Sequence, residues 1–383
     1  MTKTEEQTGP RPGRQRYDVV VIGGGAAGLS GALTLSRARR SVLVIDAGHP
    51  RNAPATHVHT YLTREGTPPG ELLAIGRAEV TGYGGEIVTA TAGAIRRRPD
   101  GDFDVTLEKI ATVDDRGAPP TGTTAGNDAV REARTAPDDG AALLDGAAVS
   151  NGKPTSDGAR TVVARRLLVA TGLVDELPGI SGLAERWGRD VLHCPYCHGW
   201  EVRDQAIGVV GTGPMSVHQA LLWRQWSADV TYFTHTAPEP GPDEREQLAA
   251  RGIPVVESRV AAVEVTGDRL TGVRLDDGRT IPRQALVVAT RLTARADVLT
   301  TLGLTPADRL LGDHVIGTHI PADPTGATTV PGVWVAGNLA DPLEQVIGAA
   351  WSGVRAAAAI NSALITADTH HAVTTHRATA STP

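Results

Sequence analysis

A chain of 383 residues has room for two domains, and its 44 glycines and 40% apolar residues are typical of an α/β protein rather than a coiled coil or a disordered chain. The net charge of −6, without a long basic run, argues against nucleic-acid binding. The polar first 16 residues lack a secretory signal and no apolar run is long enough to span a membrane, so we expect a soluble cytoplasmic protein.

The first elements predict a strand–helix–strand unit. Residues 17–22 (YDVVVI) form an apolar run typical of a buried parallel strand, and a helical pattern and the strand SVLVID follow. Gly23 permits a tight turn, Gly25 leaves room for a pyrophosphate, and Gly28 lets the helix pack close to the strand. Asp46 ends the second strand, where a carboxylate accepts hydrogen bonds from a ribose. The unit therefore predicts dinucleotide binding.

The middle of the chain changes in texture. Residues 108–160 are rich in Gly, Ala, Asp, Thr and Pro and have no sustained apolar period, so we expect a flexible surface insertion. Residues 165–172 (RRLLVATG) then predict a strand that ends in an Ala-Thr-Gly turn at Thr171 and Gly172.

The segment HCPYCHGWE holds both cysteines of the chain, Cys194 and Cys197, between His193 and His198. The pattern alone fits a glutaredoxin-like dithiol, a c-type haem attachment site, a zinc site or a redox pair beside a flavin. Haem attachment normally takes place on exported proteins, and adjacent side chains such as His193 and Cys194 rarely point into one zinc tetrahedron, so we expect no metal. In a reducing cytosol such a pair is more often catalytic than structural.

A second strand–helix–strand unit follows the cysteines. The strand AIGVVG leads into Gly211-x-Gly213-x-x-Ser216, a helical pattern and the strand DVTYF, and ALVVAT at 285–290 mirrors the earlier Ala-Thr-Gly strand. Near the C-terminus VPGVWVAGN predicts a strand that ends at Gly337-Asn338, before a long Ala-rich helix. The order predicts two Rossmann-like, three-layer nucleotide-binding domains, the second inserted in the first. The expected ranges are 14–180 with 291–366 for the outer domain, 181–290 for the inner one, and 1–13 and 367–383 for disordered tails.

Over most of its length the chain resembles the low-molecular-weight thioredoxin reductase family. Four motifs in the same order carry the resemblance: the first glycine turn with its acid, the Ala-Thr-Gly strand end, the cysteine pair before a second glycine turn, and the Gly-Asn strand end before the last helix. The resemblance implies FAD in the outer domain, a nicotinamide site in the inner one, and a homodimer. Carried over by motif, the residues at FAD would be Gly23, Gly25, Gly28, Asp46, Thr171, Gly172, Gly337, Asn338, Gln345 and Val346. In a glutaredoxin, CPYC would begin a long helix, whereas Gly199 interrupts one here, so the context favours flavin-linked dithiol chemistry.

The resemblance also implies roles for the cysteine segment. Cys197 would face the flavin C4a atom and Cys194 would exchange with the substrate. Thioredoxin reductases normally carry an Asp after the second cysteine, and His198 stands there instead, so we expect it to carry the proton. His193 could share that task or be structural. His57 and His59 either line a substrate pocket or are ordinary loop residues.

The second glycine motif departs from a nicotinamide site. Ser216 replaces a small packing residue, and residues 231–238 offer neither arginines for an NADPH phosphate nor an acid for an NAD ribose; Glu239 is the first acid. We therefore expect NADPH binding to be weak or lost and molecular oxygen to take the electrons. Because of this departure and of the segment CPYCHGWE, the chain resembles the dithiol oxidases of the gliotoxin and holomycin type, which close a small-molecule dithiol to a disulfide. The alternatives are an NADPH-dependent reductase of a thioredoxin-like protein and a non-catalytic flavin redox sensor.

Overall fold

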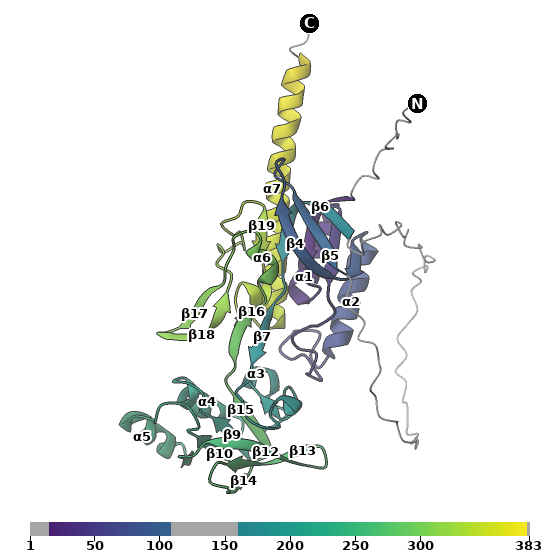
Figure 1. Ribbon diagram of the computed structural model, residues 1–383. Helices are drawn as coiled ribbons and strands as arrows, with labels where there is room; N and C mark the ends of the chain where they lie inside the picture. Colours follow the sequence, from purple (N-terminus) through teal and green to yellow (C-terminus); the bar gives the residue numbers. More distant parts are fainter. Residues whose placement is uncertain (1–14, 109–159, 381–383) are drawn as a thin grey trace, which may run out of the picture.

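The structure is a computed structural model that describes residues 15–108 and 160–380, and it has two α/β lobes, one above the other in Figure 1. The predicted tail at 1–13 and nearly all of the predicted insertion at 108–160 lie outside the described residues.

A seven-stranded sheet organises the upper lobe. Strands β3, β2, β1 and β6 lie side by side in parallel, β19 pairs in parallel with the last part of β6, and β5 and β4 extend the sheet antiparallel from its first part. The parallel strands therefore bring five carboxyl ends, those of β3, β2, β1, β6 and β19, to one edge. The bounds are β1 (Arg16–Ile22), β2 (Val42–Asp46), β3 (Glu86–Thr89), β4 (Thr91–Arg97), β5 (Phe103–Glu108), β6 (Arg160–Val169) and β19 (Val333–Val335).

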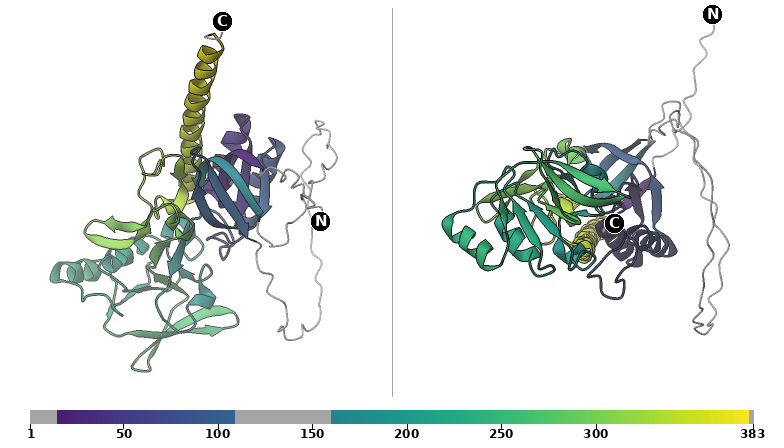
Figure 2. Two further views of the ribbon diagram at one scale, coloured as in Figure 1. Left: turned by 45° about the horizontal axis from the view of Figure 1, so that its top comes forward. Right: turned by 90° about the horizontal axis from the view of Figure 1, so that it is seen from below.

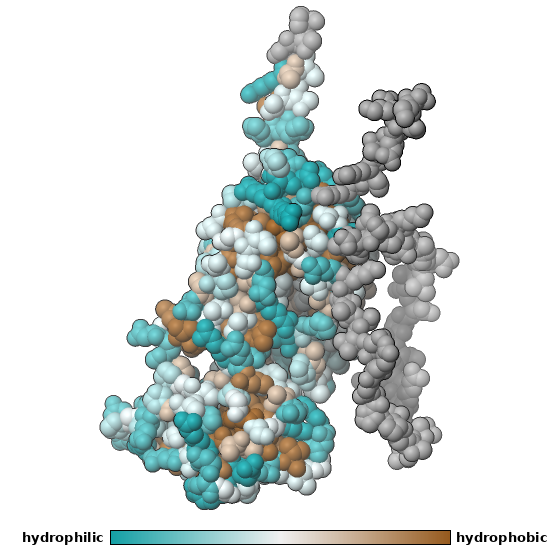
Figure 3. Space-filling model, viewed as in Figure 1, coloured by the Kyte–Doolittle hydropathy of each residue, from teal (hydrophilic) through white to brown (hydrophobic). Residues whose placement is uncertain are grey.

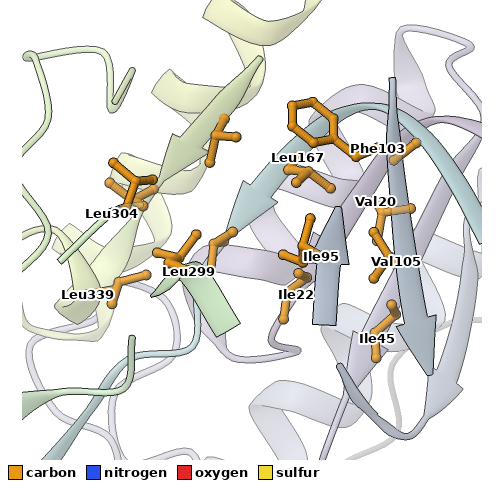
Figure 4. Packing of buried hydrophobic residues seen from close by; sticks show 14 of the residues in the cluster. Val20, Ile22, Ile45, Ile95, Phe103, Val105, Leu167, Leu299, Leu304 and Leu339 are labelled. Atoms are coloured by element: carbon orange, nitrogen blue, oxygen red, sulfur yellow. The ribbon is translucent and has the colours of Figure 1, made fainter. Parts of the chain in front are cut away.

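Each face of this sheet is covered by its own layer. The helices α1 (Ala26–Arg37), α2 (Pro69–Gly82) and α7 (Val346–Ala380) pack on one face, where alternate strand residues such as Val19 and Val21 are fully buried. On the other face β4 and β5 curl over β1 and β2, and Figure 4 shows their side chains packed together in this second core. Because both faces are buried there, residues 19–22 of β1, 42–45 of β2 and 167–169 of β6 are unbroken apolar runs, as is typical of parallel strands in α/β proteins.

The lower lobe repeats this plan on a smaller scale. Its parallel sheet has the order β11-β10-β9-β15-β8; α4 and α5 cover one face, and the antiparallel sheet β12-β13-β14 covers the other. The helical bounds are η1 (Ala184–Arg186), α3 (Pro195–His198), α4 (Ser216–Trp223) and α5 (Pro242–Ala250). The strand bounds are β8 (Val191–Leu192), β9 (Ile207–Val210), β10 (Val230–Phe233), β11 (Val255–Val256), β12 (Val260–Thr266), β13 (Arg269–Leu275), β14 (Thr280–Pro282) and β15 (Ala285–Val288).

Two strands carry the chain between the lobes. β7 (Leu173–Glu176) leaves the upper lobe and β16 (Arg291–Ala294) returns to it, and the two pair antiparallel. β16 also pairs with β18 (His314–His319) of a hairpin begun by β17 (Ala307–Leu311), and α6 (Asp297–Thr300) and η2 (Gly337–Leu339) complete the elements. The predicted fold class, two Rossmann-like domains with the second inserted in the first, is confirmed. Figure 3 shows an apolar patch at the hairpin tip, where the exposed side chains are Leu310, Leu311 and Val315.

The predicted disordered tail from residue 367 is wrong for residues 367–380. Helix α7 runs without a break to Ala380 and projects beyond the sheet in Figures 1 and 2. Its sequence from Val354 to Ala380 has no Gly or Pro to end a helix. Asp368 also anchors it to the body, because Arg40 Nη1 donates to Asp368 Oδ2 at 2.8 Å and Arg165 pairs with the other oxygen. No helix among residues 15–108 and 160–380 is both long and apolar enough to cross a bilayer.

Candidate active site

The first glycine turn forms an open cradle at the N-terminus of α1. Gly23 has a φ of +105°, and a methyl group there would lie 2.3 Å from the oxygen of Ala170. A methyl group at Gly28 would lie 1.9 Å from the oxygen of Gly23, so both positions require glycine. No atom lies within 4 Å of the position that a methyl group would take at Gly25, the N-cap of α1. This space beside unpaired helix N–H groups fits a pyrophosphate.

Asp46 lies at the end of β2, as predicted, and faces the same turn. Its Oδ1 accepts a hydrogen bond of 3.0 Å from the N–H of Gly24, and its Oδ2 pairs with Arg77 of α2. The glycine turn therefore orients the carboxylate at the switch point of the sheet, where dinucleotides bind in this fold. Arg77 gave no signal in the sequence, because it joins the site from a helix 31 residues away.

The other predicted cofactor residues gather at the ends of β6 and β19. Thr171 Oγ1 donates to the oxygen of Arg295 at 2.6 Å, and the N–H of Arg295 donates to the oxygen of Gly172 at 3.0 Å, so this turn fastens the two connections between the lobes. The N–H of Gly337 donates to the buried hydroxyl of Ser352 of α7 at 2.7 Å.

Asn338, Gln345 and Val346 lie where α7 begins. Asn338 Nδ2 donates to the oxygen of Glu344 at 2.8 Å, which braces the segment before the helix. Gln345 Oε1 accepts from Thr60 Oγ1 at 2.8 Å, and Val346 opens α7. The predicted FAD residues thus line one edge of the upper sheet, and the open glycine cradle, the acid and the amide fit FAD.

The two sulfurs belong to a short helix that follows β8. Cys194 is the N-cap of α3 and Cys197 lies one turn on; both are reduced and partly buried, and Gly199 ends the helix. A hydrogen bond from the Cys197 thiol lowers the pKa of Cys194 to about 7, aided by the N–H groups of Cys197 and Tyr196 and by the charge of Arg51. The same hydrogen bond and burial raise the pKa of Cys197. Cys194 is therefore the thiolate of the reduced pair.

Arg51 connects the sulfurs to the flavin residues, and sequence reasoning missed it. Its guanidinium donates to both carboxylate oxygens of Asp175, at 2.6 and 2.7 Å, and to Asn338 Oδ1 at 3.3 Å. Burial alone would raise the pKa of Asp175, but the hydrogen bonds and charge of Arg51 lower it, and Thr290 Oγ1 adds a third bond at 3.0 Å. The cation thus lies between Asn338 and the cysteines, at the junction of the two lobes.

The two histidines around the cysteines are held as neutral bases. Burial, with the charge of Arg51, lowers the pKa of His193. The ring donates a hydrogen bond to the backbone oxygen of Val288, and its Nδ1 is buried without a partner. Burial also lowers the pKa of His198, against the opposing charge of Glu201. Both imidazoles are uncharged near neutral pH and can accept a proton. Across residues 15–108 and 160–380, no three His, Cys, Asp or Glu side chains gather as metal ligands would.

The second glycine turn is partly closed by its own serine. Ser216 Oγ accepts the N–H groups of Thr212 and Gly213 at 3.1 and 3.2 Å, which are the loop donors that a pyrophosphate would use. Past β10, His235 Nδ1 accepts the N–H of Val260 at 3.1 Å, so it is turned to the protein's own backbone. Burial and then the charge of Arg259 lower the pKa of His235; Arg259 is a cation that the sequence around β10 did not reveal.

Comparison with known proteins identifies the family. The model of the family described as pyridine nucleotide-disulphide oxidoreductase matches residues 17–353. The chain belongs to this family. It is an FAD-dependent disulfide oxidoreductase, as the paired cysteines and the FAD cradle predict.

Individual relatives narrow the resemblance. Thioredoxin reductase sirT of Leptosphaeria maculans is 28% identical over 92% of this chain and 95% of its own length, and thioredoxin reductase aclD of Aspergillus oryzae is 28% identical over 91% and 96%. The solved structure of HlmI is 39% identical with a TM-score of 0.76, covering 95% of this chain and 97% of HlmI. The predicted resemblance to thioredoxin reductases and to dithiol oxidases of the gliotoxin and holomycin type is confirmed.

The pKa of about 7 at Cys194 predicts how this family member reacts with alkylating agents. Because the thiolate is the nucleophile, the rate of iodoacetamide modification of the reduced protein should rise with pH, pass half its maximum near that pKa and then level off. Mass spectrometry of peptides quenched at each pH measures the rate at each cysteine. A half-maximum near the usual thiol pKa of 9.0, or faster modification of Cys197, would contradict the assignment.

Proposed function

We propose that the protein oxidises a small-molecule dithiol to an intramolecular disulfide through Cys194, Cys197 and FAD, with molecular oxygen as the final acceptor and hydrogen peroxide as the product. The observation that carries the proposal is the second glycine turn, where the hydroxyl of Ser216 takes both loop N–H groups. A nicotinamide nucleotide would have to displace this hydroxyl, so its binding is weak or lost and reduced flavin must discharge to another acceptor.

The sulfur pair carries out the exchange. A substrate thiolate attacks Cys194 Sγ of the oxidised pair, the bond between the two cysteines breaks, and Cys197 leaves with the electron pair. The second substrate thiolate attacks the substrate sulfur bound to Cys194, which closes the product disulfide and releases the Cys194 thiolate. Because its pKa is about 7, the Cys194 thiolate is a better leaving group in this second step than a thiolate with the usual pKa of 9.0 would be.

The surrounding residues hold the cofactor and move protons. FAD would be bound by the first glycine turn, Asp46 and Asn338, and when bound it supplies the two-electron acceptor for the reduced pair. His198, neutral because it is buried, takes a proton from a substrate thiol, and His193 is the second available base. Arg51 favours the cysteine thiolates over the thiols.

Anaerobic mixing with NADPH tests the electron partner. We expect the flavin band of the wild-type protein to bleach quickly with a dithiol and slowly or not at all with NADPH. Replacing Ser216 with Gly frees two backbone donors, each worth about 1 kcal/mol net, and should tighten NADPH binding about tenfold or more. Ser216→Thr keeps the hydroxyl and is the matched control. Fast bleaching of the wild-type flavin by NADPH would favour the alternative, an NADPH-dependent thioredoxin reductase. Arg259, near His235, would then be the cation that binds the NADPH phosphate.

We also propose that the partners are the dithiol and oxygen alone, without nucleic acid or membrane, and that the protein works as a cytoplasmic homodimer. The exposed side chains of Ile347 and Trp351 support self-association, because their four-residue spacing places them on one face of α7, and the exposed Leu343 lies just before that helix. Light scattering that gives the mass of one chain would contradict the dimer.

A further inference from the structure

The segment from His49 to Thr67 reaches from the upper lobe toward the cysteine helix and is closed by a bridge between Val58 and Thr67. Within it, His59 lies between two carboxylates. Its Nδ1 is 2.6 Å from Glu65 Oε1, and its Nε2 is 3.4 Å from Oε1 of Glu201, which belongs to the other lobe and follows His198 by three residues. The first carboxylate is therefore local and the second belongs to the cysteine segment.

Glu65 fixes the tautomer of His59. Its other oxygen accepts the N–H of Thr60 at 2.8 Å, and the hydrogen bonds from His59 and then from Thr60 lower the pKa of Glu65, so the carboxylate is ionised and acts as an acceptor. The proton of a neutral His59 must then lie on Nδ1, which leaves the lone pair of Nε2 facing Glu201. The imidazole is 16% exposed and Glu65 is 64% exposed, so the pair joins a sheltered base to solvent.

The backbone around His59 is held in a strained shape. Thr60 and Thr63 have φ values of +59° and +73°, which β-branched residues rarely adopt. Thr60 is fixed at both ends, by Glu65 at its N–H and by Gln345 at the start of α7, to which its hydroxyl donates at 2.8 Å. Strain of this kind persists where surrounding contacts overdetermine it, and here those contacts aim the imidazole at the other lobe.

We propose that His59 is a positioning residue that relays protons between the sulfur site and solvent, acting through Glu201 and His198. The charged and titratable groups that face it are Glu65, Glu201, His57, whose ring lies 5.9 Å away, and His198, whose pKa responds to both His59 and Glu201. This inference rests on the dithiol chemistry of the proposed function, but it does not depend on the electron acceptor.

The relay balances the exchange. Oxidation of a dithiol by the cysteine disulfide forms one S–S bond, breaks one, and moves two electrons from the substrate sulfurs to Cys194 and Cys197. Each substrate thiol must lose a proton before its sulfur attacks. Cys197 takes up one of the two protons when it leaves, because its pKa is raised, and the other proton must reach solvent. His198 takes each proton from the substrate in turn, and His59 accepts the surplus proton at Nε2 through Glu201 and passes it to solvent, so His198 is again a base.

The test replaces His59 with Asn, whose amide nitrogen can keep the hydrogen bond to Glu65 but cannot carry a proton. The readout is anaerobic reduction of the FAD-loaded protein by dithiothreitol in a single turnover. We expect the rate to fall on the order of 10²-fold, the typical contribution of a proton-transfer group. The acid limb of the pH profile should shift, and added imidazole should restore part of the rate. His57→Asn in the same loop should leave rate and profile near those of the wild type.

Three outcomes have distinct meanings. A rate for His59→Asn within about threefold of the wild type at every pH would overturn the relay, since general acid–base groups contribute far more. A lower rate with an unchanged pH profile, no imidazole rescue and a lower melting temperature would assign His59 a structural role and also overturn it. A wild-type flavin that dithiothreitol cannot reduce would overturn the proposed function itself, before any variant is compared.

Discussion

Replacing Cys197 with Ser is expected to abolish dithiol oxidation while FAD remains bound. The hydroxyl cannot form the internal disulfide, and in the assigned order Cys197 is the sulfur that passes the electron pair on. Because Cys194 alone offers no route for the electrons, the loss should be on the order of 10³-fold or more. The oxygen consumed with dithiothreitol measures turnover, and the visible flavin band measures cofactor binding, which should stay unchanged because the FAD cradle belongs to the other lobe.

Cys194→Ser is the matched variant, because it removes the other sulfur of the same pair. Both variants should lose turnover, but they should differ toward a chromogenic aryl disulfide near pH 7. Cys197→Ser keeps the thiol whose pKa is about 7, and the introduced hydroxyl can still donate a hydrogen bond to it, so it should react quickly. Cys194→Ser keeps the thiol whose pKa is raised by burial and should react slowly. If Cys194→Ser reacted with the aryl disulfide faster than Cys197→Ser, the roles assigned to the two sulfurs would have to be exchanged.

The flavin cradle could be predicted from the sequence because its requirements are local. Gly23 is fixed by its positive φ and Gly28 by the oxygen of Gly23 in the same turn, so both leave a mark on the sequence that no other residue type can supply. The same holds for Ser216, which departs from the glycine pattern within its own turn, where its hydroxyl accepts the two loop N–H groups.

The polar centre at the junction of the lobes could not be predicted. Arg51 and Asp175 are 124 residues apart, and Arg51 and Asn338 are 287 apart, so no spacing rule connects them. Asp175 lies in a four-residue strand that pairs with the returning β16, and that pairing alone brings Thr290 to the carboxylate. Helix α7 was predicted only to residue 366 although no Gly or Pro ends it before Ala380, and only the contacts of Asp368 with Arg40 and Arg165 are distant in the chain.

Replacing Arg51 with Met should be the most damaging single change to stability in this region. The side chain of Asp175 is 7% exposed and that of Arg51 is 28% exposed, so the variant leaves a buried carboxylate without its cation. Breaking a buried pair in this way costs about 3–5 kcal/mol of unfolding free energy. Urea denaturation measures it, and Arg64→Met, an exposed arginine of the same loop, should change the free energy by about 0.5 kcal/mol or less.

The pH dependence of the unfolding free energy distinguishes the loss of this ion pair from a loss of packing around Arg51. Arg51 lowers the folded-state pKa of Asp175, so the pair stabilises the fold above the usual carboxyl pKa of 3.8, and this contribution is lost as the pH falls through the lowered value. The difference between wild type and Arg51→Met should therefore shrink in acid. Adding Asp175→Asn to Arg51→Met should restore part of the stability, because the unpaired charge is gone. The pKa of Cys194, which rises when Arg51 is removed, should stay above its wild-type value, because the nearby cation is still missing. If the double variant recovered both stability and thiol acidity, Arg51 would act on the sulfurs only through the fold.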